Sequence, residues 1–111
     1  MEVERQKLLQ LFFYVPESHL QSVKAALFEA GAGQLAGYSQ CCWQIKGMGQ
    51  FKPSDTASPF LGEADQLSQE IEYKVEMLCF EHTAASVLQA LLKAHPYEVP
   101  AYGFIELRNI I

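Results

Sequence analysis

The sequence predicts an α+β domain whose strands and helices follow one another in the order β-α-β-β-α-β. Alternating apolar residues mark the strands, and apolar residues at three- and four-residue spacing mark two helices. The two helices also share one apolar pattern at a constant offset, as a duplicated half-domain would leave. Because 111 residues are about one domain's length and 50% are hydrophobic, we expect residues 1–111 to form a single domain with its own core.

The first strand is predicted over 7–15 and the first helix over 17–30. Residues 7–15 are almost all apolar or aromatic, which suits a buried strand. Pro16 ends the strand because it has no N–H to donate, and Gly31 offers a left-handed cap after the helix. The helix carries one apolar stripe made by Leu20, Val23, Leu27 and Ala30.

A second strand is predicted over 38–46, where side chains alternate between two faces. Its apolar face is expected to carry Cys41, Trp43 and Ile45. Cys41 is then a small buried hydrophobic residue, and Cys42 points to the opposite side. The two thiols therefore cannot ligate one ion from a regular strand.

Residues 47–69 are rich in Gly, Pro, Ser and Asp, and we expect a long loop there, outside the core. Within it, Gly47 and Gly49 predict a turn that could also present backbone N–H groups to an anion. No helix follows these glycines, so neither standard phosphate fingerprint matches. Lys52 is the residue best placed to test for an anionic ligand.

The third strand is predicted over 70–79 and the last over 101–107, with the second helix between them. The third strand has a face expected to be buried, made by Ile71, Tyr73, Val75, Met77 and Cys79. The helix should end at His95-Pro96, because a residue before proline is driven out of helical geometry. Two β-α-β halves joined in this way predict a ferredoxin-like sandwich, with an antiparallel sheet and two helices on one face.

Composition excludes several classes of protein. A net charge of -5 and eight scattered basic residues argue against nucleic-acid binding. The apolar runs are too short to span a membrane, and residues 1–5 do not resemble a signal peptide. Three cysteines without a disulfide framework favour a reducing compartment, and we expect a cytoplasmic protein.

Several short motifs occur in a fixed order along the chain. They are Val15-Pro16-Glu17-Ser18-His19, Glu29-Ala30-Gly31-Ala32-Gly33, Gly47-Met48-Gly49-Gln50-Phe51-Lys52-Pro53, Pro59-Phe60-Leu61-Gly62-Glu63 and His95-Pro96-Tyr97-Glu98-Val99-Pro100-Ala101-Tyr102. In this order the chain resembles the YqfO-like domain, which also occurs as an insert in Nif-three-like dinuclear metal-centre proteins. The resemblance covers 9–107.

The resemblance implies a fold like that of the PII signalling proteins and the CutA cation-tolerance proteins. It also implies self-assembly, since those relatives are trimers. The segment from His95 to Pro100 is similar to a CutA stretch, although Ala101 stands where CutA usually has an acid. The metal ligands of the large Nif-three-like proteins lie in flanking domains, so their metal chemistry is not carried over.

The residues leave two kinds of site open. A ligand site would use Gly47, Gly49, Lys52 and Tyr97. A divalent-metal site would use His95 and Glu98 with further ligands, because two ligands are too few. The alternative reading of His95 to Pro100 is a rigid turn in which the Tyr97 ring packs. His19 and His82 are expected near the surface, and no residue set points to catalysis.

The sequence therefore predicts a non-catalytic regulatory or scaffolding module. It would form a homo-oligomer, as a trimer, and bind a small ligand or a protein partner, with no cofactor required. The alternative from another class is a divalent-metal-binding protein like CutA. A metal-assisted hydrolase is a third hypothesis, kept only because the large relatives are suspected of such chemistry.

Overall fold

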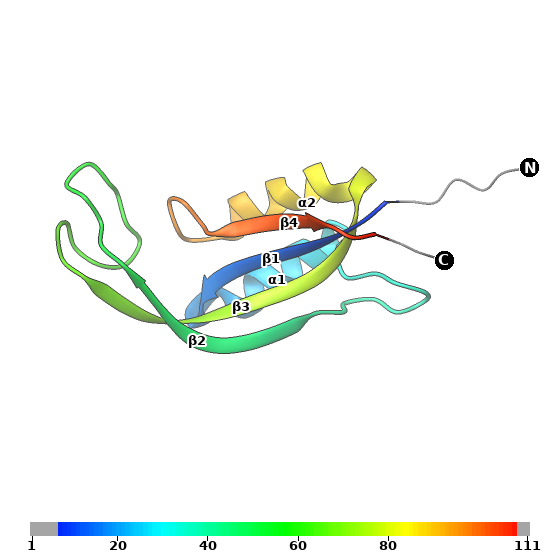
Figure 1. Ribbon diagram of the computed structural model, residues 1–111, viewed down its shortest axis with the longest axis horizontal. Helices are drawn as coiled ribbons and strands as arrows, with labels where there is room; N and C mark the ends of the chain where they lie inside the picture. The colour runs from blue at the N-terminus through cyan, green and yellow to red at the C-terminus, as the bar shows by residue number, and fades with distance from the viewer. Residues whose placement is uncertain (1–6, 109–111) are drawn as a thin grey trace, which may run out of the picture.

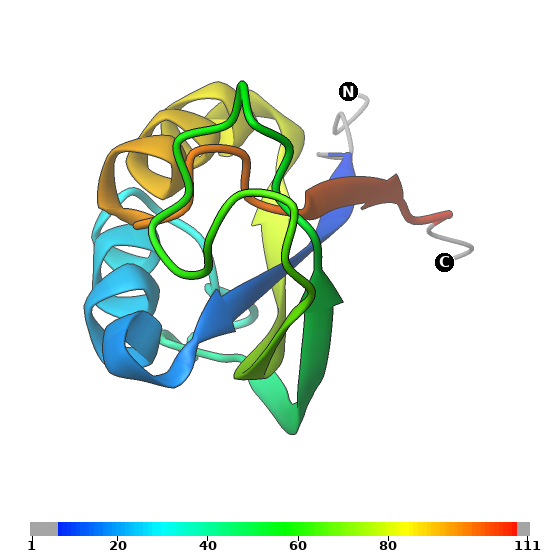
Figure 2. The same ribbon diagram turned by 90° about the vertical axis from the view of Figure 1, so that its left-hand side faces the viewer.

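The computed structural model describes residues 7–108 and contains one four-stranded antiparallel sheet with two helices on one face (Figure 1). The sheet has the order β2-β3-β1-β4. The elements are β1 (Leu8–Pro16), a 3₁₀ turn η1 (Glu17–His19), α1 (Leu20–Glu29), β2 (Trp43–Phe51), β3 (Ser68–Phe80), α2 (Glu81–Ala94) and β4 (Tyr102–Glu106). Figure 2 shows both helices on the same side of the sheet, so the predicted fold class is confirmed.

The core lies between the helices and the inward faces of β1 and β3. The stripes of the two helices meet there, as the shared sequence pattern predicts: Val23 and Leu27 of α1 and Val87 and Leu91 of α2 are all fully buried. The central strands complete the core with Leu11, Phe13, Val15, Val75, Met77 and Cys79. Replacing one of these leucines by alanine typically costs about 2–5 kcal/mol of stability.

Both helices end where the sequence predicts. Gly31 follows α1 with φ +110°, a left-handed conformation that strains any other residue. At the end of α2, His95 is extended with φ −73° and ψ 133° because Pro96 follows. The segment 95–101 then turns back toward the sheet and enters β4.

The predicted position of the second strand is wrong. β2 occupies Trp43–Phe51 instead of 38–46, so Gly47 and Gly49 are strand residues and not a turn. The pairing decides this, because β3 extends to Ser68 and pairs residue by residue with β2, including Gly47 with Glu72 and Gly49 with Glu70. The loop is correspondingly shorter and runs over 52–67.

The predicted buried face of that strand is also wrong. Cys41 is exposed, and its neighbour Cys42 packs against the core instead. Trp43 is 57% exposed and Ile45 is 48% exposed, because both lie on the sheet face opposite the helices. The position of Trp43 follows from its pairing with Glu76, since cross-strand partners share a face.

The third strand is longer than predicted, and its apolar face is buried only in part. Val75, Met77 and Cys79 are buried, but Ile71 is 41% exposed. The reason is visible in Figure 1, where the far part of the β2/β3 hairpin curves past the ends of the helices. Among residues 7–108, neither helix reaches that part of the hairpin.

Residues 1–5, from which we expect no export, lie outside the described residues. Within 7–108, no helix is long and apolar enough to cross a membrane.

Candidate functional site

The sheet face opposite the helices carries a pocket of about 410 Å³ where the β2/β3 hairpin curves away from the core. We call this uncovered face the open face. Its pocket is lined by Tyr14, Gly47, Gly49, Glu72, Lys74 and Tyr97, among others. Three of the four residues predicted to bind a ligand, Gly47, Gly49 and Tyr97, are thus brought together.

A carboxylate and a phenol meet in the lining of the pocket. Tyr97 donates a hydrogen bond from its hydroxyl group to Oε2 of Glu72 over 2.6 Å. Burial raises the pKa of Tyr97, and the hydrogen bond to the Glu72 carboxylate raises it further. Tyr97 therefore remains a protonated donor, and Glu72 keeps its second oxygen for another partner.

Gly49 makes room for the Glu72 carboxylate. A Cβ atom at position 49 would collide with the side chain of Glu72, whereas a Cβ at Gly47 would meet no atom within 4 Å. The two glycines are therefore not equivalent. Gly49 is needed for the close approach of Glu72, and Gly47 leaves the pocket floor open.

His95 fixes the backbone of Tyr97 through hydrogen bonds to two backbone groups. Its Nε2 lies 2.7 Å from the carbonyl oxygen of Tyr14, and its Nδ1 accepts the backbone N–H of Tyr97 at 3.1 Å. A carbonyl only accepts and an amide only donates, so the proton is assigned to Nε2. Burial lowers the pKa of His95, although the hydrogen bond to Tyr14 opposes this, and the ring is neutral.

Lys74 provides the positive charge of the pocket. Its Nζ lies 5.5 Å from the ring centre of Phe12 and 6.0 Å from that of Tyr14. The ion pairs found within 7–108 all involve Lys7, so Lys74 has no carboxylate partner there. Glu72 and Lys74 thus stand on one face of β3 with their charges unpaired.

The loop 52–67 closes the far side of the site. The backbone N–H of Ser58 donates to Oε1 of Glu98 at 3.0 Å, and the ring of Phe60 packs on His19 at 5.3 Å between centres. Phe60 also lies 6.5 Å from Tyr97. A second hollow of about 250 Å³ lies under this loop and borders Tyr97 from its other side.

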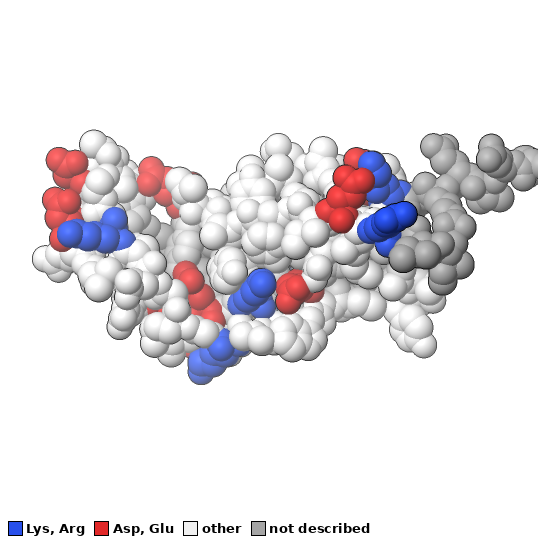
Figure 3. Space-filling view, in the orientation of Figure 1, with Lys and Arg blue, Asp and Glu red and all other residues white. Residues whose placement is uncertain are grey.

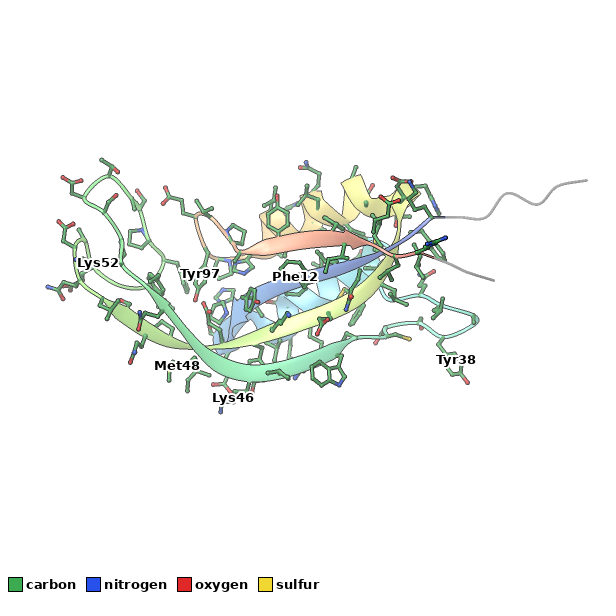
Figure 4. All side chains as sticks on the ribbon, viewed as in Figure 1. Phe12, Tyr38, Lys46, Met48, Lys52 and Tyr97 are labelled. Atoms are coloured by element: carbon green, nitrogen blue, oxygen red, sulfur yellow. The ribbon has the colours of Figure 1, made fainter. Side chains whose placement is uncertain are left out.

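Lys52 lines this second hollow and not the pocket. In Figure 4 it lies on the loop side of the hairpin, beyond Met48, while Tyr97 lies beside the turn before β4. Lys52 is exposed. The predicted ligand set is therefore divided between two neighbouring hollows, with Tyr97 between them.

The predicted metal ligands are not assembled into a site within one chain. Both ring nitrogens of His95 are engaged with backbone groups, and Glu98 is engaged with Ser58. No group of three or more His, Cys, Asp or Glu side chains able to hold a metal ion occurs among residues 7–108. The alternative, a rigid turn with a packed Tyr97 ring, agrees with the geometry. His82 is exposed as expected, while His19 is half-buried against Phe60.

Sequence reasoning missed Glu72, Lys74 and Tyr14. The alternation of β3 does place Glu72 and Lys74 on the polar face, but that pattern alone is typical of a solvated surface. Nothing in the sequence shows that Tyr97, 25 residues from Glu72, reaches the same point. The pocket is a product of tertiary structure.

The rest of the open face is largely apolar. Figure 3, which views this face, shows uncharged atoms over most of it, with charges at both ends and in a short stretch in the middle. Trp43, Ile45 and Ile105 are 57%, 48% and 49% exposed, and all three lie on this face. Phe12 and Leu78 lie there half-buried, and a Cβ at Gly103 would clash with the Phe12 ring.

Comparison with known proteins finds relatives that share one name. A scan against protein-family models finds no match. Proteins called GTP cyclohydrolase 1 type 2 homolog are 45% identical over 94 residues in Mycobacterium leprae and 39% identical over 104 residues in Halalkalibacterium halodurans. These matches cover 85% and 94% of this chain but only 24% and 28% of the relatives, so the chain spans about a quarter of their length.

Solved structures agree with the sequence relatives. A Bacillus cereus protein related to NIF3 superposes with a TM-score of 0.83 and 30% identity, over 98% of this chain and 28% of that one. CutA from Synechococcus elongatus superposes with a TM-score of 0.66 and 18% identity, over 95% of this chain and 80% of that one. The second likeness shows the fold alone.

Proposed function

Since this chain belongs to the YqfO/NIF3 family, as the counterpart of one segment of its larger members, we propose that it is a non-catalytic module that assembles with copies of itself and binds a small ligand. The observation that carries the proposal is the open face of the sheet, which is apolar and covered by no other element within 7–108. Larger exposed apolar patches usually mark interaction surfaces. The occupant we propose is a second copy of this chain.

The edges of the sheet support self-association. β2 and β4 are the two outer strands of the order β2-β3-β1-β4, and each has one edge without a partner strand in the described chain. Unpaired strand edges readily pair with another chain. An edge β2 on one copy can pair with an edge β4 on the next in a head-to-tail contact, and repeated contacts of that kind form a ring when the rotation from copy to copy closes.

We propose a ring of three, with the open faces turned inward. A closed ring leaves no free edge, and it buries Trp43, Ile45 and Ile105 against neighbouring copies. The trimers implied by the resemblance to CutA and PII proteins are consistent with this number. In such a ring the pocket at Glu72 lies beside the contact between copies.

The described residues favour binding over catalysis. Ser18 Oγ lies 2.8 Å from His19 Nδ1, but both belong to the 3₁₀ turn, and the His19 ring packs on Phe60 instead of facing the pocket. The larger relatives are named only as homologs of a GTP cyclohydrolase, and they are about three and a half times as long as this chain. We therefore propose no catalytic role and no required cofactor, and a cytoplasmic location that suits three free cysteines.

Light scattering across a concentration series tests the assembly, with one arm containing zinc and another a chelator. We expect a mass of three chains in both arms. Trp43→Glu places a charge on the open face and should shift the mass toward one chain. The control is Leu92→Glu, at an exposed position of α2, and it should leave the mass unchanged. A single-chain mass for the wild type at all concentrations contradicts the proposal, and assembly only with zinc supports the metal-binding alternative.

A further inference from the structure

We propose that the pocket on the open face binds a small zwitterion, such as a free amino acid with an apolar side chain. Its ammonium group would contact Glu72 and its carboxylate would contact Lys74. This inference rests on the ligand-binding part of the proposed function. The ligand class is then a zwitterion, and Glu72 and Lys74 are the residues that bind its two charged groups.

The spacing of the two charges carries the inference. Glu72 and Lys74 are two positions apart on β3, so they share a face and their Cα atoms are about 7 Å apart. In a free amino acid the ammonium group and the carboxylate are bonded to the same carbon atom, and the two groups span the gap between two such side chains when each makes one charge-assisted hydrogen bond. Both contacts can then form at once.

The structure also keeps the two charges from neutralising each other. Tyr97 donates to Oε2 of Glu72, while Oε1 lies over Gly49 and has no hydrogen-bond partner among the described residues, so it can accept from a ligand. On the other side, the ammonium group of Lys74 lies over the rings of Phe12 and Tyr14. A ligand that enters between them supplies each charge with the partner that it lacks among the described residues.

Other ligand chemistries fit less well. A phosphate or nucleotide would meet one lysine and the Glu72 carboxylate, so half of the charged lining would repel it. A simple amine would leave Lys74 unpaired and close by, and a simple acid would leave Glu72 unpaired. Only a ligand that carries both charges satisfies both side chains.

The remaining lining sets the size and polarity of the ligand. The pocket volume of about 410 Å³ is within the usual range for small-molecule sites. Ile45, Ala101 and the rings of Tyr14 and Tyr97 border it, which suits an aliphatic or aromatic side chain. Gly47 leaves open space on the floor.

Calorimetry with three matched compounds tests the inference on the wild-type protein. They are phenylalanine, 2-phenylethylamine, which lacks the carboxylate, and 3-phenylpropionate, which lacks the ammonium group. We expect phenylalanine to bind at least about tenfold more tightly than either analogue, since one charge-assisted hydrogen bond contributes at least that factor. Equal binding of an analogue, or binding of none of the three at millimolar concentration, overturns the inference.

Two variants then assign the contacts. Glu72→Gln should weaken phenylalanine to the level of 3-phenylpropionate, and Lys74→Gln should weaken it to the level of 2-phenylethylamine. Glu70→Gln and Lys46→Gln are matched controls outside the pocket lining and should bind as the wild type does. If the controls lose as much affinity as the pocket variants, the assigned contacts are wrong.

Light scattering on the same samples separates this inference from the proposed assembly. An assembled protein that binds none of the three compounds contradicts only the ligand class. A single-chain protein that still prefers phenylalanine contradicts only the assembly.

Discussion

Tyr97 joins the turn after α2 to the β2/β3 hairpin, because its hydroxyl group donates to Oε2 of Glu72 at 2.6 Å. The contact links two segments that share no strand pairing. It also positions Glu72, whose carboxylate is the only one among the described residues that line the pocket.

Removing the Tyr97 hydroxyl should loosen the site. We expect Tyr97→Phe to lower the free energy of unfolding by about 1–2 kcal/mol, since a half-buried hydrogen bond to a charged group is lost while the ring is kept. Urea unfolding measures the change. Tyr38→Phe is the control, because Tyr38 is 74% exposed at the tip of the 34–42 loop (Figure 4) and should have no effect. Equal stability of the two variants would contradict the role given to Tyr97.

The two strand glycines provide a second matched pair. Gly49→Ala should displace the Glu72 carboxylate, because the new methyl group needs the space that it occupies, and should lower stability by about 1 kcal/mol through the weakened hydrogen bond with Tyr97. Gly47→Ala should be neutral or slightly stabilising, since its Cβ meets open space and alanine restricts the unfolded chain. Thermal unfolding of both variants checks the difference. If Gly47→Ala is as unstable as Gly49→Ala, the clash with Glu72 does not explain the effect at position 49.

The buried imidazole predicts how stability depends on pH. The pKa of His95 in the folded protein lies below its ordinary value of 6.5, so the unfolded chain binds more protons between the two values. His95 therefore contributes full stability above pH 6.5 and loses it as the pH falls through the folded pKa. Glu72 and His19 also face the ring, and their charges act in opposite directions on this pKa.

Urea unfolding between pH 5 and 8 measures this effect. We expect the wild type to lose stability on acidification below about 6.5, and His95→Gln to lose less over the same interval while being less stable throughout. His82→Gln, at an exposed position, should follow the wild-type curve. A His95→Gln curve parallel to that of the wild type would show that His95 does not titrate as proposed.

Glu98 predicts how firmly the loop 52–67 is held. Glu98→Ala removes the acceptor of the Ser58 N–H and should increase cleavage within the loop by an added protease several-fold, because local opening becomes easier. Global stability should change little. Glu63→Ala, in the same loop, is the control. If cleavage of the two variants is equal, Glu98 does not anchor the loop.

The sequence by itself determined the order of the elements, the core stripes of both helices and the two helix ends. These features depend on local periodicity and on residues with special backbone geometry, such as Gly31 and Pro96. Leu27 and Leu91 are buried as predicted, because the apolar stripe of an amphipathic helix packs against the core.

Only the tertiary structure decided the position of β2 and the composition of the pocket. A strand takes its register from its partner, and Gly47 and Gly49 have no side chains to signal a face, so their pairing with β3 could not be read locally. The same holds for Trp43, which lies on the open face because of its pairing with Glu76. The pocket joins Tyr97 to Glu72 across segments distant in sequence, and such contacts exist only once the sheet has formed.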